Sequence, residues 1–372
     1  MPYLKSENGQ IIITVTGLEA LVAAIFEGAG CAPDEARQVS HYMVDGNLAG
    51  HDSHGVIRTK RYVSWMGDRV FPGRDIEIVS ESDNFVIVDG NYGFGQIIAP
   101  KAVQIGIDKA KKNGVCVVTL RNSGHIGRVG TWAEMTVEQN VVFVGFVNVR
   151  ASLLVAPFNG VDRRISTAPF TVGIPVPDDE PIILDFATSA VAEGKALVAL
   201  QGGKKLPPEV LIFPDGTRTS DPVALYGEQS PGQVANPMDG PGALRALGDH
   251  KGAGLAFVCE ILAGAFSGAG CAGPLPRRFS NNMLAIFMDV DAFNSQDGFA
   301  AEIRSYSDFF TSSRPEEEGV KVLTPGQQER IHRADRLANG VPMSDGAWES
   351  IIETAEKVGM SPEEIERAIN AK

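Results

Sequence analysis

The sequence predicts an α/β protein, and three features of the chain support this class. Helical patterns occupy both ends, short apolar runs typical of strands fill the middle, and no ordinary Rossmann glycine motif is present. At 372 residues the chain exceeds the usual domain size of roughly 100 to 200 residues, so we expect two structural units. We place a discontinuous helical unit in residues 1–82 and 306–372, and an α/β unit in residues 83–305.

Helical signals dominate the first eighty or so residues. Thr16 and Glu19 have the spacing of a capping box before an apolar helix, and Pro33 opens a second helical pattern. The chain returns to a helical pattern after Asp308, and the segment 361–364 forms another capping-box pattern with proline at the first helical position. We therefore expect the two ends to form one helical unit beside the sheet.

Short apolar runs separated by turn residues fill the central part of the chain. Their length and their content of Val, Ile and Phe are typical of β-strands. The runs are 85–90, 115–120, 141–149, 181–186, 210–216 and 283–290. Two longer helical patterns, 97–113 and 251–267, interrupt them, so we expect helices to flank the sheet.

Charge and cysteine usage exclude several classes of function. The formal net charge is −13, from 46 acidic and 33 basic residues without a long block of one sign, which disfavours binding to nucleic acid or to an anionic membrane. The four cysteines are widely spaced without a CxxC pair, which favours buried thiols over disulfides or a zinc site. Because neither a signal-peptide pattern nor a bilayer-spanning run occurs, we expect a cytoplasmic protein.

One glycine motif has to be rejected as a dinucleotide-binding turn. The segment 268–273 matches GxGxxG, but it follows a helix instead of a strand, and Pro274 breaks the next element. The turn 93–95 does follow a strand pattern, but it lacks the third glycine. Any dinucleotide cofactor is therefore expected to be held in a non-Rossmann manner.

The segment between His51 and Tyr62 gathers an imidazole, a hydroxyl, a guanidinium and a phenol. If this segment is helical, Ser53 or His54, Arg58 and Tyr62 share one face. Reduction of a 2-oxo acid needs a proton donor for the developing alkoxide and a cation for the carboxylate, which His54 and Arg58 would supply. The alternative is a solvated polar helix start, and spacing alone leaves both interpretations open.

Three further segments carry candidate groups, each with a plainer alternative. The Gly-rich segment 122–130 follows a strand pattern and places His125 and Arg128 in a loop, although a simple turn is the commoner explanation. Asp185 ends an apolar strand pattern, where it either orients an imidazole or caps the next helix. Lys251 lies at the start of an apolar helix, where backbone N–H groups attract a phosphate.

Several motifs, in this order, make the chain resemble the malate/L-lactate dehydrogenase type 2 family over nearly its whole length. They are NLAGHDSHGVIR, GFGQ, NSGHIGRVGTWAE, VAPFNG, ILDFATSAVAEGKALVA, DHKGAGLAFVCEILAGAFSGAG and PGQQER. The resemblance implies a mostly antiparallel, non-Rossmann sheet flanked by helices, and a helical unit from both termini that completes a homodimer. It also implies hydride transfer between a nicotinamide cofactor and C2 of a small 2-hydroxy or 2-oxo acid.

The same resemblance implies roles for the catalytic residues. His54 exchanges a proton with the substrate oxygen, with Ser53 and Asp185 in a relay to it, and His125 is the rival for this role. The residues implied to contact the substrate are Arg58 and Tyr62. We interpret Arg150, where relatives tend to carry Asn, as an added substrate anchor.

For the cofactor, NAD or NADP with NAD preferred, the resemblance points to three segments and a lysine. These residues are Ser152, Thr167, Ala168, Pro169, Lys251, Pro325, Gly326 and Gln327. Two departures from the family pattern bear on cofactor choice. Ala168 stands where the family usually has Asn, and Gln327 stands where it has Glu.

Two other functions stay open on the sequence. A reductase of a cyclic 2-imino acid would use the same hydride geometry with nitrogen in place of oxygen. A catalytically inactive family member is the other alternative, supported by the altered segment 167–169. We expect no metal site, because no close second pair of ligands accompanies His51 and His54.

Overall fold

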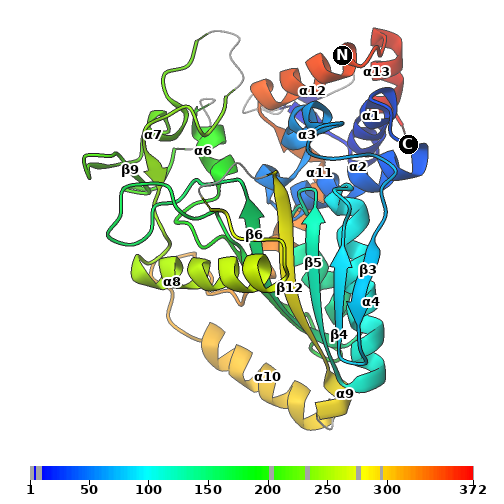
Figure 1. Cartoon of the computed structure of the whole chain (residues 1–372), viewed down its shortest axis with the longest axis vertical. Coiled ribbons are helices and arrows are strands. Elements are labelled where there is room, and N and C mark those ends of the chain that lie inside the picture. Colours follow the sequence, from blue (N-terminus) through cyan, green and yellow to red (C-terminus); the bar gives the residue numbers. More distant parts are fainter. Residues whose placement is uncertain are drawn as a thin grey trace.

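A mixed seven-stranded sheet forms the centre of the molecule (Figure 1). The computed structural model describes residues 4–5, 11–200, 205–230, 235–273, 278–293 and 296–371. The strands lie in the order β3-β4-β5-β12-β6-β7-β8. Their bounds are Glu77–Glu81 (β3), Phe85–Asp89 (β4), Val115–Ser123 (β5), Ser280–Asp289 (β12), Val141–Arg150 (β6), Phe170–Ile174 (β7) and Ile182–Phe186 (β8). The predicted α/β class, with a mixed sheet between helices, is confirmed.

Strand β12 lies in the middle of this sheet although it comes late in the chain. It pairs antiparallel with both β5 and β6. Among the described strands of this sheet, only β4 and β5 run parallel, and α4 (Gly95–Asn113) makes the crossover that a parallel pair requires. The other five pairings are antiparallel.

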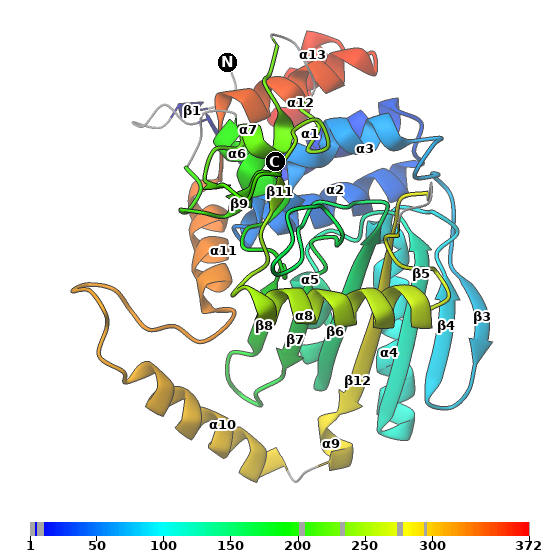
Figure 2. The same ribbon diagram turned by 60° about the vertical axis from the view of Figure 1, so that its left-hand side comes forward.

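Helices cover both faces of the sheet (Figure 2). On one face α4 and α5 (Gly130–Val137) bury a core with the strands, and Gly106 of α4 lies so close to β12 that a Cβ there would be 2.5 Å from the Phe287 ring. On the other face α8 (His250–Cys259) continues into the π-helical segment η3 (Glu260–Phe266). The helical pattern predicted for 251–267 is thus present, with a π-helical second half.

A second hydrophobic cluster joins residues from both ends of the chain. Its helices are α1 (Val15–Gly28), α2 (Pro33–Leu48), α3 (Thr59–Trp65), α12 (Asp345–Lys357) and α13 (Pro362–Ile369). Helix α1 packs against α2, α12 and α13. The small sheet of β1 (Leu4–Lys5), β2 (Ile11–Ile13) and β13 (Val341–Met343) also pairs strands from the two ends.

The two predicted capping boxes have different outcomes. Ser361 and Glu364 form the box at the start of α13 as predicted. The box predicted at Thr16 is wrong, because the N-cap of α1 is Thr14, whose side chain accepts a hydrogen bond from the backbone N–H of Gly17. The Thr16 hydroxyl instead donates to a carbonyl oxygen near the C-terminus.

A third cluster contains short elements. They are α6 (Glu193–Leu200), β9 (Leu211–Ile212), α7 (Val223–Tyr226) and β11 (Ala243–Leu244), and β10 (Arg218–Thr219) pairs with β9 outside the cluster. The run 210–216 was expected to be a full strand, but it contributes only the two residues of β9, to a separate three-stranded sheet. Its second half is a turn in which Gly216 has φ of +88°. The sequence pattern missed β3, whose residues are all exposed, and β7.

Between β12 and β13 the chain forms α9 (Val290–Phe293), α10 (Gln296–Thr311) and α11 (Gln327–Asn339). Helix α10 projects away from the sheet in both views (Figures 1 and 2). The helical pattern expected after Asp308 ends with α10 at Thr311 and resumes only at Gln327. Cys31, Cys116 and Cys259 are buried free thiols. No helix in the described part of the chain is long and apolar enough to cross a membrane.

Candidate active site

Two short 3₁₀ turns, η1 (Asp52–His54) and η2 (Val56–Arg58), link α2 to α3 and carry the predicted catalytic residues. The segment is therefore not one continuous helix. The Asn47 side chain donates to Asp52 Oδ1 at 2.6 Å and accepts from the backbone N–H of Val56 at 2.9 Å. Gly55 lies directly against this amide, since a Cβ there would be 2.2 Å from Asn47 Oδ1.

Arg336 of α11 holds the same loop from the other side. Its guanidinium donates to both carboxylate oxygens of Asp52, at 2.6 and 3.0 Å, and to the backbone carbonyl of Asn47. The guanidinium is buried, and a bidentate pair of this kind fixes direction as well as distance. These contacts orient the turn that carries Ser53 and His54.

The imidazoles of His54 and His125 stack on each other. Their ring centroids are 5.4 Å apart and the rings are inclined by 9°. His125 comes from the loop between β5 and α5, so two segments far apart in the sequence meet here. Both histidines were predicted as candidates for the acid/base role, and the structure brings them together.

Tyr62 completes this group from α3. Its hydroxyl lies 2.5 Å from His125 Nδ1 and accepts a hydrogen bond from Gln96 Nε2 at 3.3 Å. The backbone N–H of Gly127 also donates to His125 Nδ1, at 3.2 Å. Because Nδ1 accepts these bonds, the neutral His125 ring carries its proton on Nε2.

Both imidazoles are neutral at ordinary pH. Burial, and then the nearby Arg58 guanidinium, lower the pKa of His54 to about 3. The same two causes, in the same order, hold the pKa of His125 well below its usual value. Burial also raises the pKa of the Tyr62 phenol, which therefore keeps its proton. A neutral imidazole is able to accept a proton from a substrate hydroxyl.

Arg58 is held by two contacts. Its Nε donates to the Ser53 carbonyl at 2.6 Å, and its Nη2 lies 3.1 Å from Glu193 Oε2. Arg61 also reaches Glu193, at 3.4 Å, and the Tyr226 hydroxyl donates to Glu193 Oε1 at 2.9 Å. Sequence reasoning missed Glu193, because an acidic residue at the start of a helix usually only stabilises the helix terminus.

Asp185 and Arg128 lie on the α5 side of the site. Asp185 accepts hydrogen bonds from the backbone N–H of Gly130 at 2.7 Å and from the Thr171 hydroxyl at 2.8 Å. Its predicted relay to His54 stays a prediction. Arg128 Nη1 pairs with Glu134 at 2.8 Å.

Some buried polar atoms of this region have no partner among the described residues. They are His54 Nδ1, Gln96 Oε1, and Arg128 Nε and Nη2. Buried polar groups are normally hydrogen-bonded, so these atoms are candidates for contacts with a bound substrate.

Arg150 lies in a different set of contacts. Its guanidinium donates to the carbonyls of Ala269 at 2.6 Å and Arg278 at 2.9 Å, and to the Tyr92 hydroxyl at 3.0 Å. All three nitrogens are therefore engaged by the protein. These contacts with the protein are sufficient to hold the Arg150 side chain in place, and its role as a substrate anchor stays a prediction.

The residues predicted to hold the cofactor lie in three places. Thr167 accepts hydrogen bonds from Thr188, and Ala168 is buried with φ of +32°, an uncommon backbone conformation for a residue with a side chain. Pro169 accepts from the backbone N–H of Val147, and the backbone N–H of Ser152 donates to Val149 at the end of β6. Strained backbone of this kind clusters at ligand sites.

The 325–327 turn packs against β8. The Pro325 carbonyl accepts from the backbone N–H of Ile183, and Gly326 has φ of +93° at the N-cap of α11. The Gln327 side chain accepts from the backbone N–H of Thr324. The turn therefore lies two residues along β8 from Asp185.

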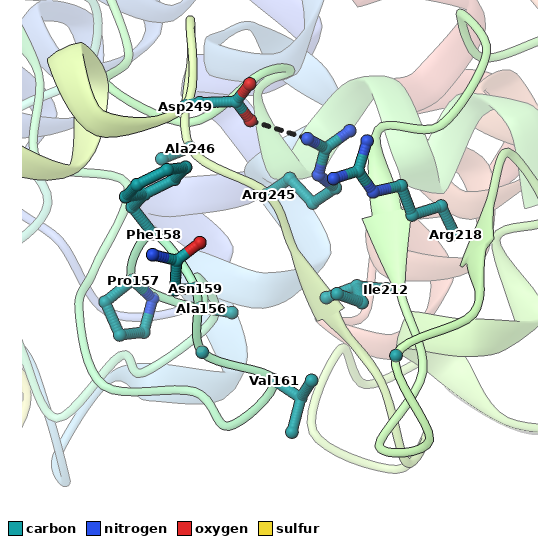
Figure 3. A pocket seen from close by; sticks show the side chains of 12 residues that line it. Ala156, Pro157, Phe158, Asn159, Val161, Ile212, Arg218, Arg245, Ala246 and Asp249 are labelled. Carbon is teal, nitrogen blue, oxygen red and sulfur yellow. Dashed lines mark hydrogen bonds and ion pairs between the residues drawn. The ribbon is translucent and has the colours of Figure 1, made fainter.

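A cavity of about 170 Å³ lies beside the start of α8 (Figure 3). Phe158, which is about half exposed, lines one side, and Arg218 and Arg245 line the other. Arg245 is paired with Asp249 at 2.6 Å. Lys251, which is exposed, follows two residues later. An aromatic face and a carboxylate suit the base and the ribose hydroxyls of a nucleotide.

Comparison with known proteins gives matches over nearly the whole chain. The family model of malate/L-lactate dehydrogenases matches residues 13–352. Hydroxycarboxylate dehydrogenase B of Escherichia coli (strain K12) is 36% identical over 353 residues, which are 93% of this chain and 94% of that protein.

Two solved structures also match. Malate dehydrogenase from Pyrococcus horikoshii OT3 has a TM-score of 0.82 at 26% identity, with 96% of this chain and 98% of that chain covered. Delta1-piperideine-2-carboxylate reductase from Pseudomonas syringae pvar. tomato has a TM-score of 0.76 at 25% identity, with 92% and 99% covered. The chain belongs to the malate/L-lactate dehydrogenase family.

Proposed function

We propose that this protein is an NAD- or NADP-dependent dehydrogenase that transfers a hydride at C2 of a small 2-hydroxy or 2-oxo acid. The observation that carries the proposal is the stacked pair of neutral imidazoles beside Arg58, in a chain of this family. A proton acceptor and a carboxylate-binding cation are the two groups that this reaction requires.

The residues of the chain then have the following roles. Arg58 binds the substrate carboxylate and so presents the C2 hydroxyl to the imidazoles. In oxidation His54 accepts the hydroxyl proton, and in reduction it returns the proton to the oxygen; Ser53 and Asp185 support it. His125, with its proton on Nε2 and Tyr62 behind Nδ1, donates a hydrogen bond to the same oxygen.

The nicotinamide ring supplies the hydride acceptor or donor. Its cofactor would be held by the three segments described above and by Lys251, and the cavity beside α8 fits the nucleotide end. NAD is preferred. Asp249 can accept a hydrogen bond from a ribose hydroxyl, and the guanidinium groups of Arg218 and Arg245 already have carboxylate partners.

Replacement of the histidines tests these roles. General acid or base help is typically worth ~10² to 10⁴ in rate, so His54→Ala is expected to lose about that factor in turnover while it keeps cofactor affinity. His41→Ala is the matched control, because His41 lies exposed on α2. If His54→Ala keeps its turnover and His125→Ala loses it, the acid/base role belongs to His125.

A second reaction is favoured by one comparison. The fold also matches a delta1-piperideine-2-carboxylate reductase, although at lower identity than the hydroxy-acid dehydrogenases. Reduction of a cyclic 2-imino acid would use the same arginine and imidazoles. Turnover of such an imino acid without turnover of any 2-oxo acid would select this alternative.

The assembly is part of the proposal. We propose a cytoplasmic homodimer, with a helical unit of residues 1–82 and 306–372 and a non-Rossmann cofactor unit of residues 83–305. Large apolar side chains that are exposed to solvent in the described part of the chain support an interface between two copies of this protein. On α8 and η3 these are Phe257 and Phe266, exposed by 64% and 68%, and on α10 Phe309, exposed by 76%.

A further inference from the structure

We propose that Glu193 is a specificity residue that makes the site favour 2-oxo and 2-hydroxy monocarboxylates over substrates with a second anionic group. The inference rests on the proposed function. It concerns the charge of the substrate and not the chemistry at C2.

Glu193 is built into the place where a substrate carboxylate is expected to bind. Its side chain is only 7% exposed, and its two oxygens contact Arg58, Arg61 and Tyr226. Gly194, the next residue, lies against Ser53, because a Cβ there would be 2.1 Å from Ser53 Cβ. The start of α6 is therefore packed directly against the catalytic turn.

The charge balance of this cluster limits what it can bind. Burial alone would raise the pKa of Glu193, but Arg58 and Arg61 outweigh burial and hold it at about 2, so the carboxylate is ionised. Two guanidinium groups and one carboxylate leave one net positive charge. Arg128, the next cation, has its charge balanced by Glu134 through Nη1, although its Nε and Nη2 have no partner among the described residues. One substrate carboxylate therefore neutralises the cluster, and a second anionic group meets no cation whose charge is still unbalanced.

The geometry at Arg58 leads to the same preference. Its Nε is used by the Ser53 carbonyl and its Nη2 by Glu193, so a substrate on this arginine lies beside the Glu193 carboxylate. A second anionic group of the substrate would lie roughly 6 to 8 Å from the Glu193 carboxylate. At that separation and an effective dielectric constant of about 20, the repulsion between the two negative charges changes the relative rates of the two substrate classes by about tenfold to a hundredfold.

Pyruvate and oxaloacetate are a matched pair of probes, because they differ only by the second carboxylate. The holoenzyme is assayed with each acid and the reduced cofactor, and the ratio of kcat/KM for the two acids is the readout. The wild type is expected to prefer pyruvate by at least about tenfold. Glu193→Gln, which keeps the shape and the hydrogen bond from Tyr226, is expected to shift the ratio towards oxaloacetate by about tenfold or more.

Two further variants separate charge from structure. Glu193→Asp keeps the charge and is expected to keep the wild-type preference. Glu353→Gln removes an exposed carboxylate that pairs with Lys60 on α3, and is expected to leave the ratio unchanged.

Two results would overturn the inference. A wild-type preference for oxaloacetate contradicts it without any variant, and an equal ratio in Glu193→Gln and the wild type contradicts it as well. In both cases one of the acids is still turned over, so the proposed function stands. Wild-type turnover of no 2-oxo acid would overturn the proposed function, and this inference with it.

Discussion

Acidification is expected to destabilise this protein through the two stacked imidazoles. Burial lowers the pKa of His54 to about 3 and holds that of His125 well below its usual value, whereas in the unfolded chain both return to about 6.5. The unfolded state therefore binds more protons than the folded state below this pH. The contribution of the neutral rings to the free energy of unfolding is fully present above pH ~6.5. It is lost as the pH falls towards the pKa values that the two imidazoles have in the folded state.

The size of the loss follows from the linkage. Below pH ~6.5, each imidazole that stays neutral in the folded state lowers the free energy of unfolding by about 1.4 kcal/mol per pH unit. Over about two pH units, the two imidazoles together therefore lower the free energy of unfolding by about 5 kcal/mol. Because a typical domain is stable by only about 5 to 15 kcal/mol, such a loss is large enough to measure easily.

Denaturant unfolding at neutral pH and at about pH 4.5 measures this acid-induced loss of unfolding free energy. His54→Asn and His125→Asn are each expected to reduce the acid loss by about 1.4 kcal/mol per pH unit relative to the wild type. His41→Asn is the control of opposite sign, because its hydrogen bond to Glu19 raises the pKa of His41 and so stabilises the folded state in acid. Equal acid losses in the wild type and in the double variant of His54 and His125 would refute the neutral resting state.

Two further predictions concern the contacts of the site and of the core. Tyr62→Phe removes a buried hydroxyl that bonds His125 and Gln96, and is expected to cost about 1 to 3 kcal/mol of unfolding free energy and to lower kcat more than cofactor affinity. Unchanged kcat would remove Tyr62 from the site. Gly106→Ala is expected to lower the denaturation midpoint through a cost of about 1 to 3 kcal/mol, because its Cβ would meet the Phe287 ring. Gly254→Ala, a helical glycine with open space around it, is the control and is expected to be neutral or stabilising; equal midpoints for the two variants would contradict the packing argument.

Local signals in the sequence predicted local structure well. The capping box at Ser361 and the proline start of α2 depend on residues within one helical turn, so the sequence pattern contains them completely. The strand runs of β4, β5, β6, β8 and β12 were found for the same reason. The turn at 214–216 cut short the predicted run that became β9, because turn residues override an apolar pattern.

Contacts between distant segments could not be derived from spacing. The insertion of β12 between β5 and β6 depends on packing of the whole sheet. Glu193 meets Arg58 across 135 residues, and no local pattern marks an acidic residue as the partner of an arginine so far away. Helical spacing would have placed His54, Arg58 and Tyr62 on one face, whereas the structure uses two 3₁₀ turns and brings in His125 from another loop.

The most direct test of the central claim is the absorbance of the reduced nicotinamide band on mixing the protein with a panel of 2-oxo acids and a cyclic imino acid, with NADH and NADPH in separate runs. The proposed function predicts oxidation of the cofactor by at least one 2-oxo acid, faster with NADH. No oxidation by any 2-oxo acid, with cofactor binding intact, would contradict it.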